Sequence, residues 1–203
     1  LVMAGNHDVA SDIEGDNALG PFEFMEHTRP VVTPLFSKAH KLLLVPFDPK
    51  KGAREAIIDA LEPISEVDRE GVILAIHAGI RDDAVPGYLV SDSSVHMDDL
   101  IALCSDSKLG GVVAGDWHYQ QVFLGFAVAS NTPFKLIQCG ALVPTGWDNP
   151  GLDGYGGHVS WDGKEMTVHP SIPGPRYVTA TSVGDLDTPD EAVTGLRVRY
   201  RPE

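Results

Sequence analysis

The sequence predicts an α/β fold, in which short buried strands alternate with amphipathic helices. Three short apolar runs, at residues 1–4, 72–76 and 111–114, read as buried strands because each is bounded by polar or small residues. Between the last two runs, Met97, Leu100, Ile101 and Cys104 follow the i, i+3, i+4, i+7 spacing of a helix with one apolar face. Strands that alternate with such helices are typical of an α/β domain.

The first half of the chain carries the elements between the first two buried strands. A strand is expected at 41–47, where prolines end the apolar run. Residues 54–67 have apolar side chains at helical spacing, and Pro63 should kink or end that helix. The strand at 72–76 ends at His77, and a polar loop is expected after it, over 81–94.

The second half of the chain is richer in strands. They are expected at 121–129, 135–139, 157–161 and 165–169. Asp162-Gly163 is a strong hairpin-turn signal between the last two. The acidic tail from Gly184 resembles a linker, and 196–200 a short strand that docks elsewhere. We therefore predict a domain over 1–180, followed by a linker and C-terminal extension over 181–203.

Composition and charge limit the classes of function. The 203 residues include 15 Lys+Arg and 29 Asp+Glu, a net charge of −14, whereas a protein that grips DNA by itself usually has a basic surface. Bound cations or a partner subunit would offset that acidity. No apolar run approaches the ~20 residues that cross a bilayer, and Cys104 and Cys139 read as reduced core thiols. These features predict a cytoplasmic protein with no membrane association.

The segment Gly5-Asn6-His7-Asp8 is the most informative part of the sequence. It follows the first predicted strand, at the strand end where α/β sheets present ligands. An Asn side-chain oxygen is a neutral donor for a divalent cation, and a titratable imidazole comes next. Asn-His-Asp is also ordinary turn chemistry, so this segment alone does not establish a site.

Two further segments repeat the same design. His77 ends the apolar run at 72–76, and Gly115-Asp116-Trp117-His118 follows the run at 111–114. A single His at a strand end is more often a hydrogen-bonded structural residue. Three strand ends that each carry Asn, His or Asp favour a metal site over three unrelated strand caps.

Together these segments resemble the last three motifs of the calcineurin-like metallophosphoesterases. That family carries DxH, a GD motif, GNH followed by Asp or Glu, a lone His and finally GHxH. The resemblance implies a two-metal hydrolase on a four-layer α/β/β/α sandwich. Further similarity, to the closing strands of the SbcD-type DNA exonuclease branch, lies in residues 139–144, 156–159 and 175–177.

Two departures from the family pattern stand out. Asp116 replaces the first His of the last motif, and a carboxylate favours harder ions such as Mn²⁺ or Mg²⁺ over Zn²⁺. The first two motifs are missing. The other acidic candidates lie in polar, loop-like surroundings and do not replace them: Asp12, Asp16, Asp48, Asp82 and Asp83. We therefore expect roughly 30–90 residues to precede Leu1, from the ~30 residues of each βαβ unit, and expect 1–203 alone to lack a competent site.

The resemblance and phosphodiester chemistry imply a role for each residue. In two-metal sites the two cations lie about 3.5–4 Å apart, where they neutralise charge on the phosphate and lower the pKa of a bound water molecule. Asn6, His77 and Asp116 would hold one ion, and His118 would help to hold the other. His7 would be the general acid that protonates the leaving group, oriented by Asp8.

The leading hypothesis is a metal-dependent phosphodiesterase, specifically an SbcD-like DNA nuclease that uses two divalent ions. Mn²⁺ is the expected metal, with Mg²⁺, Fe²⁺ or Zn²⁺ as alternatives, and an ATPase subunit or a second copy of the chain are the implied partners. Two alternatives stay open: a cyclic-nucleotide phosphodiesterase or phosphatase, and a degenerate subunit that binds without catalysis.

Overall fold

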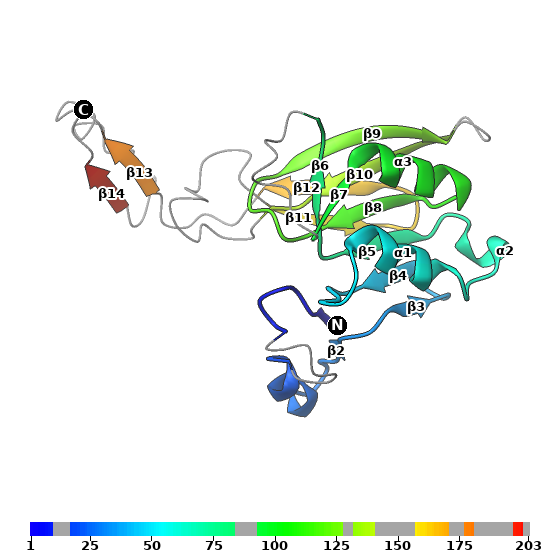
Figure 1. Ribbon diagram of the computed structural model, residues 1–203, viewed down its shortest axis with the longest axis horizontal. Helices are drawn as coiled ribbons and strands as arrows, with labels where there is room; N and C mark the ends of the chain where they lie inside the picture. Colours follow the sequence, from blue (N-terminus) through cyan, green and yellow to red (C-terminus); the bar gives the residue numbers. More distant parts are fainter. Residues whose placement is uncertain are drawn as a thin grey trace. The chain divides into compact units, whose positions relative to one another are not determined.

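The computed structural model of the chain describes residues 1–9, 17–83, 93–127, 132–140, 157–170, 177–180 and 197–200. Its residues fall into two units, each described here by itself. The first comprises Leu1–Asp116 with Val122–Gln138, and the second comprises Trp117–Gln121 with Cys139–Glu203. Figure 1 labels most of their helices and strands.

A six-stranded mixed sheet forms the centre of the first unit. In spatial order its strands are β3 (Leu35–Ser37), β4 (Leu42–Val45), β5 (Ile73–Ile76), β8 (Gly111–Ala114), β10 (Thr132–Gln138) and β9 (Gln121–Ala127). The four strands β4, β5, β8 and β10 run parallel, and β3 is antiparallel to β4. The predicted α/β class is confirmed.

One row of side chains crosses the four parallel strands. Leu43 pairs with Leu74, Leu74 with Val112, and Val112 with Leu136. All four are at most 1% exposed. Full burial of such a side chain contributes about 1.5–3 kcal/mol relative to exposure, so this row fixes the register of the strands that carry the candidate site.

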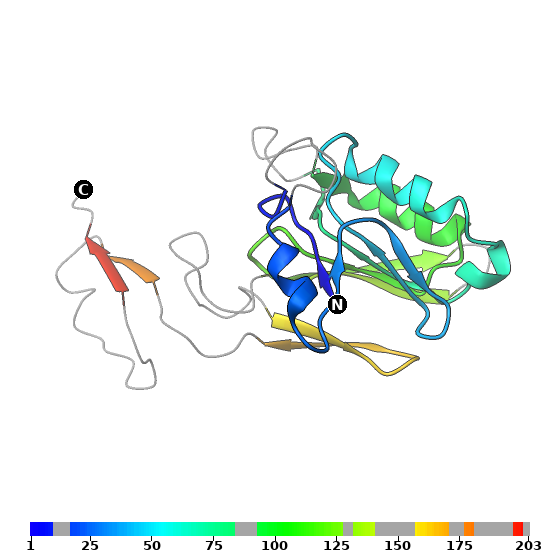
Figure 2. The ribbon, with the colours of Figure 1, turned by 90° about the horizontal axis from the view of Figure 1, so that it is seen from below.

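Two helices cover one face of this sheet: α1 (Ala53–Leu61) and α3 (Met97–Asp106) (Figure 2). Their apolar faces join the core through residues such as Ile57 and Leu100. The helix expected over 54–67 ends at Leu61, and α2 (Glu66–Arg69) begins after Ser65, whose hydroxyl caps the Asp68 N–H. Pro63 lies between the two helices, as its missing N–H predicts.

Both cysteines are free thiols. Cys104 on α3 is fully buried, and burial raises its pKa to about 12. Cys139 is partly buried, and burial raises its pKa to about 11. Both thiols are therefore neutral near pH 7, as expected for packing residues.

The first predicted strand is less buried than expected. β1 (Val2–Met3) pairs in parallel with β2 (Pro30–Val31) and is not part of the six-stranded sheet. Val2 and Met3 are partly exposed, and Leu1 is 62% exposed, so only Ala4 of the apolar run is buried. A short 3₁₀ helix, η1 (Gly20–Phe24), precedes β2.

Two short strands fall where a polar loop was predicted. β6 (Gly79–Arg81) and β7 (Ser94–His96) form a parallel pair, so the prediction of a loop over 81–94 is wrong at both ends. Ile80 and Val95 are the buried members of the pair. With one buried apolar residue each, these strands leave too weak a pattern to detect.

The second unit contains the predicted hairpin. β11 (Gly157–Trp161) and β12 (Met166–Pro170) are antiparallel, and Asp162 Oδ1 accepts the backbone N–H of both Lys164 and Glu165 in the turn. β13 (Tyr177–Ala180) pairs in parallel with β14 (Arg197–Tyr200). The domain boundary proposed at 180 stays a prediction.

Several sequence-based expectations fall on other segments. Asp12 and Asp16, the similarity at 141–144, 156 and 175–176, the end of the strand at 128–129 and the linker from 184 lie outside the described residues. In the part of the chain that is described, every helix is too short or too polar to span a membrane.

Candidate metal centre

The carboxyl ends of two adjacent parallel strands, β5 and β8, bring polar residues to one edge of the sheet. His77 follows β5, and Asp116 follows β8 after one glycine. The sheet hydrogen bonding continues past the strands, because the His77 N–H donates to the Val45 carbonyl (3.4 Å) and the Gly115 N–H to the Ile76 carbonyl (2.9 Å). Ligand sites of α/β sheets lie at this edge.

The loop after β1 reaches the same edge through backbone hydrogen bonds. The Phe47 N–H, just after β4, donates to the Ala4 carbonyl (3.1 Å), and the Ala4 N–H donates to the Val31 carbonyl (3.0 Å). Asp8 Oδ2 accepts the Gly5 N–H at 2.8 Å and closes the turn. Asn6 is thereby held beside the end of β5.

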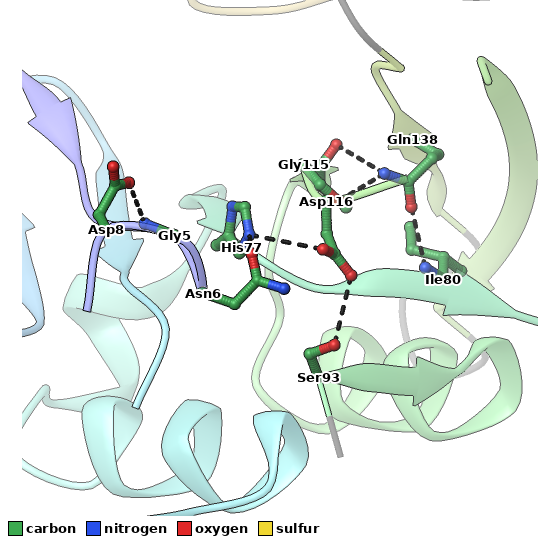
Figure 3. Close-up of polar contacts among 10 residues, drawn as sticks. Gly5, Asn6, Asp8, His77, Ile80, Ser93, Gly115, Asp116 and Gln138 are labelled. Atoms are coloured by element: carbon green, nitrogen blue, oxygen red, sulfur yellow. Dashed lines mark hydrogen bonds and ion pairs between the residues drawn. The ribbon is translucent and has the colours of Figure 1, made fainter. Parts of the chain in front are cut away.

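Asn6, His77 and Asp116 meet there and form what we call the Asn6–His77–Asp116 cluster. His77 Nε2 lies 3.1 Å from Asn6 Oδ1 and 3.6 Å from Asp116 Oδ1. Figure 3 shows the three side chains pointing toward one another. The His77 and Asp116 side chains are only 21% and 13% exposed, so both are partly withdrawn from solvent.

Gly5 makes room for the His77 ring. A Cβ on Gly5 would lie 2.5 Å from His77 Cε1, whereas a Cβ on Gly115 would be in ordinary contact with Nδ1, at 3.4 Å. Gly5 therefore lets the backbone pack directly against the imidazole. This explains physically why a glycine precedes Asn6, a point that the sequence pattern alone did not reveal.

Asp116 has an unusual backbone conformation. Its φ is 81°, in the left-handed region that non-glycine residues rarely adopt. Its carboxylate is also held from the side, because Ser93 Oγ donates to Oδ2 at 3.3 Å. Left-handed residues of this kind cost free energy and concentrate at functional sites, and here the conformation turns the carboxylate toward His77.

Gln138, at the end of β10, is a supporting residue that sequence reasoning missed. It is completely buried. Its Oε1 accepts the Ile80 N–H (2.9 Å), and its Nε2 donates to the carbonyls of Gly115 (2.5 Å) and Ala114 (3.3 Å). Gln138 therefore ties the Gly115–Asp116 turn to β6 (Figure 3).

The geometry of the cluster fits donors that share one cation. Two ligand atoms about 2.1 Å from one ion lie about 3.0 Å apart in octahedral and about 3.4 Å apart in tetrahedral geometry. The observed separations of 3.1 and 3.6 Å are close to these values. One imidazole nitrogen with an amide and a carboxylate oxygen suits a harder divalent ion such as Mn²⁺. A set of three His, Cys, Asp or Glu ligands does not occur among the described residues, since the third donor here is an Asn.

His7, Asp8 and His118 are the other predicted site residues. His7 is exposed, one residue after Asn6, and the Asp8 carboxylate is engaged by Gly5. His118 belongs to the second unit, between Trp117 and Tyr119, whose rings pack with centroids 5.6 Å apart. The roles assigned to His7, Asp8 and His118 stay predictions.

Comparison with known proteins identified no similar protein. No protein-family model, curated protein or solved structure matches the chain. Inference about function therefore rests on the residues and geometry described above.

Proposed function

We propose that the chain is a metal-dependent phosphoesterase of the calcineurin-like type that hydrolyses phosphodiester bonds. The observation that carries the proposal is the convergence of Asn6, His77 and Asp116, from three separate segments, at spacings suited to one cation. The proposed fold is the four-layer α/β/β/α sandwich. The six-stranded sheet with α1 and α3 on one face supports two of those layers.

The cluster residues would bind the ion through Asn6 Oδ1, His77 Nε2 and Asp116 Oδ1. When bound, a divalent cation neutralises charge on the phosphate and lowers the pKa of a water molecule. Gly5, Ser93 and Gln138 would hold the three donors in place before the ion arrives. Such support limits the reorganisation that binding requires.

His7 would act on the leaving group. It adjoins a proposed ligand and is exposed, so its ring is accessible to a substrate. An imidazole carries a transferable proton near pH 7, which allows it to protonate a leaving alkoxide. His118 would contribute to a second ion, and both ions are proposed to be Mn²⁺.

DNA is the leading substrate within this proposal, through the resemblance to SbcD-type exonucleases. The net charge of −14 opposes unaided binding to a duplex. We therefore propose that an ATPase partner subunit supplies much of the DNA contact, in the cytoplasm. The cluster would then supply the chemistry.

A small-molecule phosphodiesterase is the second candidate. A cavity of about 360 Å³, lined in part by Asn6, adjoins the cluster. This volume lies at the lower end of the range for small-molecule sites. It suits a substrate the size of one nucleotide.

The test is hydrolysis of bis(4-nitrophenyl) phosphate by the full product of the gene, including any residues encoded before Leu1. Mn²⁺-dependent turnover is expected, with a loss of at least about 10²-fold in His77→Ala. His40→Ala, at an exposed position far along the sequence from the cluster, is the matched control and should retain turnover. Turnover that is absent, or that survives His77→Ala, would reject the proposal.

A further inference from the structure

The cavity beside the Asn6–His77–Asp116 cluster is lined on one wall by charged side chains that are not proposed metal ligands. Besides Asn6, its lining includes Phe47, Asp48, Lys50, Lys51 and Ser93. Asn6 belongs to the cluster, and Ser93 donates a hydrogen bond to Asp116. The cavity therefore adjoins the cluster through Asn6 and Ser93.

The two lysines of this wall differ in their partners. Lys51 Nζ forms a 2.5 Å ion pair with Asp59, and that contact raises its pKa. The Lys50 ammonium has no ion pair with any described residue, and Lys50 is exposed. Lys50 is thus the cation of this wall that is available to a ligand.

The local backbone fixes where Lys50 lies. Asp48 Oδ1 accepts the Lys50 N–H at 2.9 Å, so the Asp48 carboxylate is engaged in the turn that precedes α1. Gly52, another lining residue, is the N-cap of α1 and offers no side-chain cap. The amides of the first helical turn and the partial positive charge at that end add to the attraction for an anion.

The cavity also has apolar surface. Phe47 and Pro49 supply apolar surface, and Phe47 is only partly buried. Aromatic side chains provide stacking surfaces for nucleobases. A cation, an aromatic ring and a volume of about 360 Å³ match a ligand with one base, one sugar and one phosphate.

We propose that this cavity binds the nucleotide unit next to the scissile phosphodiester, with Lys50 holding that unit's own phosphate and Phe47 facing its base. The inference rests on the proposed function and narrows the substrate to nucleotide chain ends or dinucleotides. A base-paired duplex interior is too large for a cavity of this volume.

The test measures binding in the absence of metal, so that it does not depend on turnover. Thymidine 5′-phosphate and thymidine are titrated into the full-length protein by calorimetry, in the presence of EDTA. Thymidine 5′-phosphate should bind about tenfold more tightly than thymidine, because its phosphate makes one charge-assisted contact with Lys50. Lys50→Ala should remove most of that difference. Lys164→Ala makes the same change in charge in the β11–β12 turn and should preserve it.

The outcomes separate this inference from the proposed function. Equal affinity for the two ligands in the unmodified protein, or a preference that survives Lys50→Ala, would overturn the cavity assignment even if bis(4-nitrophenyl) phosphate is hydrolysed. A preference that is lost in Lys50→Ala and kept in Lys164→Ala would support it even if no hydrolysis is found.

Discussion

Gly5 determines how closely the backbone approaches the His77 imidazole. A Cβ at this position would lie 2.5 Å from Cε1, so Gly5→Ala must displace the ring or the loop. We expect Gly5→Ala to weaken Mn²⁺ binding at least about tenfold, because a displaced ring no longer aligns with Asn6 and Asp116. Isothermal calorimetry measures the affinity.

Gly20→Ala is the matched control for this substitution. A Cβ on Gly20 meets nothing within 4 Å, so the same chemical change creates no contact there. Equal Mn²⁺ affinity in Gly5→Ala, Gly20→Ala and the unmodified protein would show that ring placement does not govern metal binding.

Asp116 combines a left-handed backbone with a proposed ligand. Asp116→Ala and Asp116→Gly both remove the carboxylate, but only glycine adopts a φ near 81° without a Cβ penalty. The free energy of unfolding should be about 1 kcal/mol higher for Asp116→Gly than for Asp116→Ala. Both variants should lose Mn²⁺ affinity. Denaturant unfolding gives the difference, and equal stability would argue against backbone strain at this residue.

His7 is predicted to be a general acid and not a metal ligand. His7→Ala should keep the metal content and slow hydrolysis of an alkyl phosphodiester by about 10²–10⁴-fold. The loss should shrink for a 4-nitrophenyl ester, whose leaving group needs little protonation. Metal analysis of the purified variant is the decisive readout, since a loss of Mn²⁺ would make His7 a ligand.

At the scale of elements, Gln138 links β10 to β6 and to the turn after β8. Gln138→Met keeps the approximate volume but leaves the Ile80 N–H and the Gly115 carbonyl without their partner. Each unsatisfied buried group costs about 1–3 kcal/mol, so the loss of two partners should lower the unfolding free energy by about 2–6 kcal/mol. Thermal and urea unfolding measure it. A loss below about 0.5 kcal/mol would show that other groups or water replace the amide.

The strands that position the cluster are the ones that the sequence predicted best. β4, β5 and β8 lie in continuous apolar runs because a parallel strand buries both of its faces. β6 and β7 were missed because each has one buried apolar side chain among three residues. α1 ends at Leu61, before Pro63, as expected, whereas the second helix, α2, begins after the Ser65 cap.

At the scale of the whole molecule, the sequence predicted which residues matter better than how they are supported. Asn6, His77 and Asp116 were identified because each follows an apolar run. Gln138 forms hydrogen bonds with Ile80 and Gly115, which lie 58 and 23 residues away, so no local sequence pattern predicts them. The left-handed φ of Asp116 likewise cannot be predicted from the apolar run before it. The periodicity of apolar residues predicts which side chains are buried. It does not predict the hydrogen bonds of Gln138 to residues distant in sequence, or the backbone conformation of Asp116.

The most direct measurement of the central claim is anomalous diffraction at the manganese edge from crystals of the protein soaked in Mn²⁺. The account predicts an anomalous peak about 2.0–2.4 Å from Asn6 Oδ1, His77 Nε2 and an Asp116 carboxylate oxygen. The same peak should be absent from His77→Ala crystals. No peak at the cluster, or a peak that remains there in His77→Ala, would contradict the claim that these three residues form a metal site.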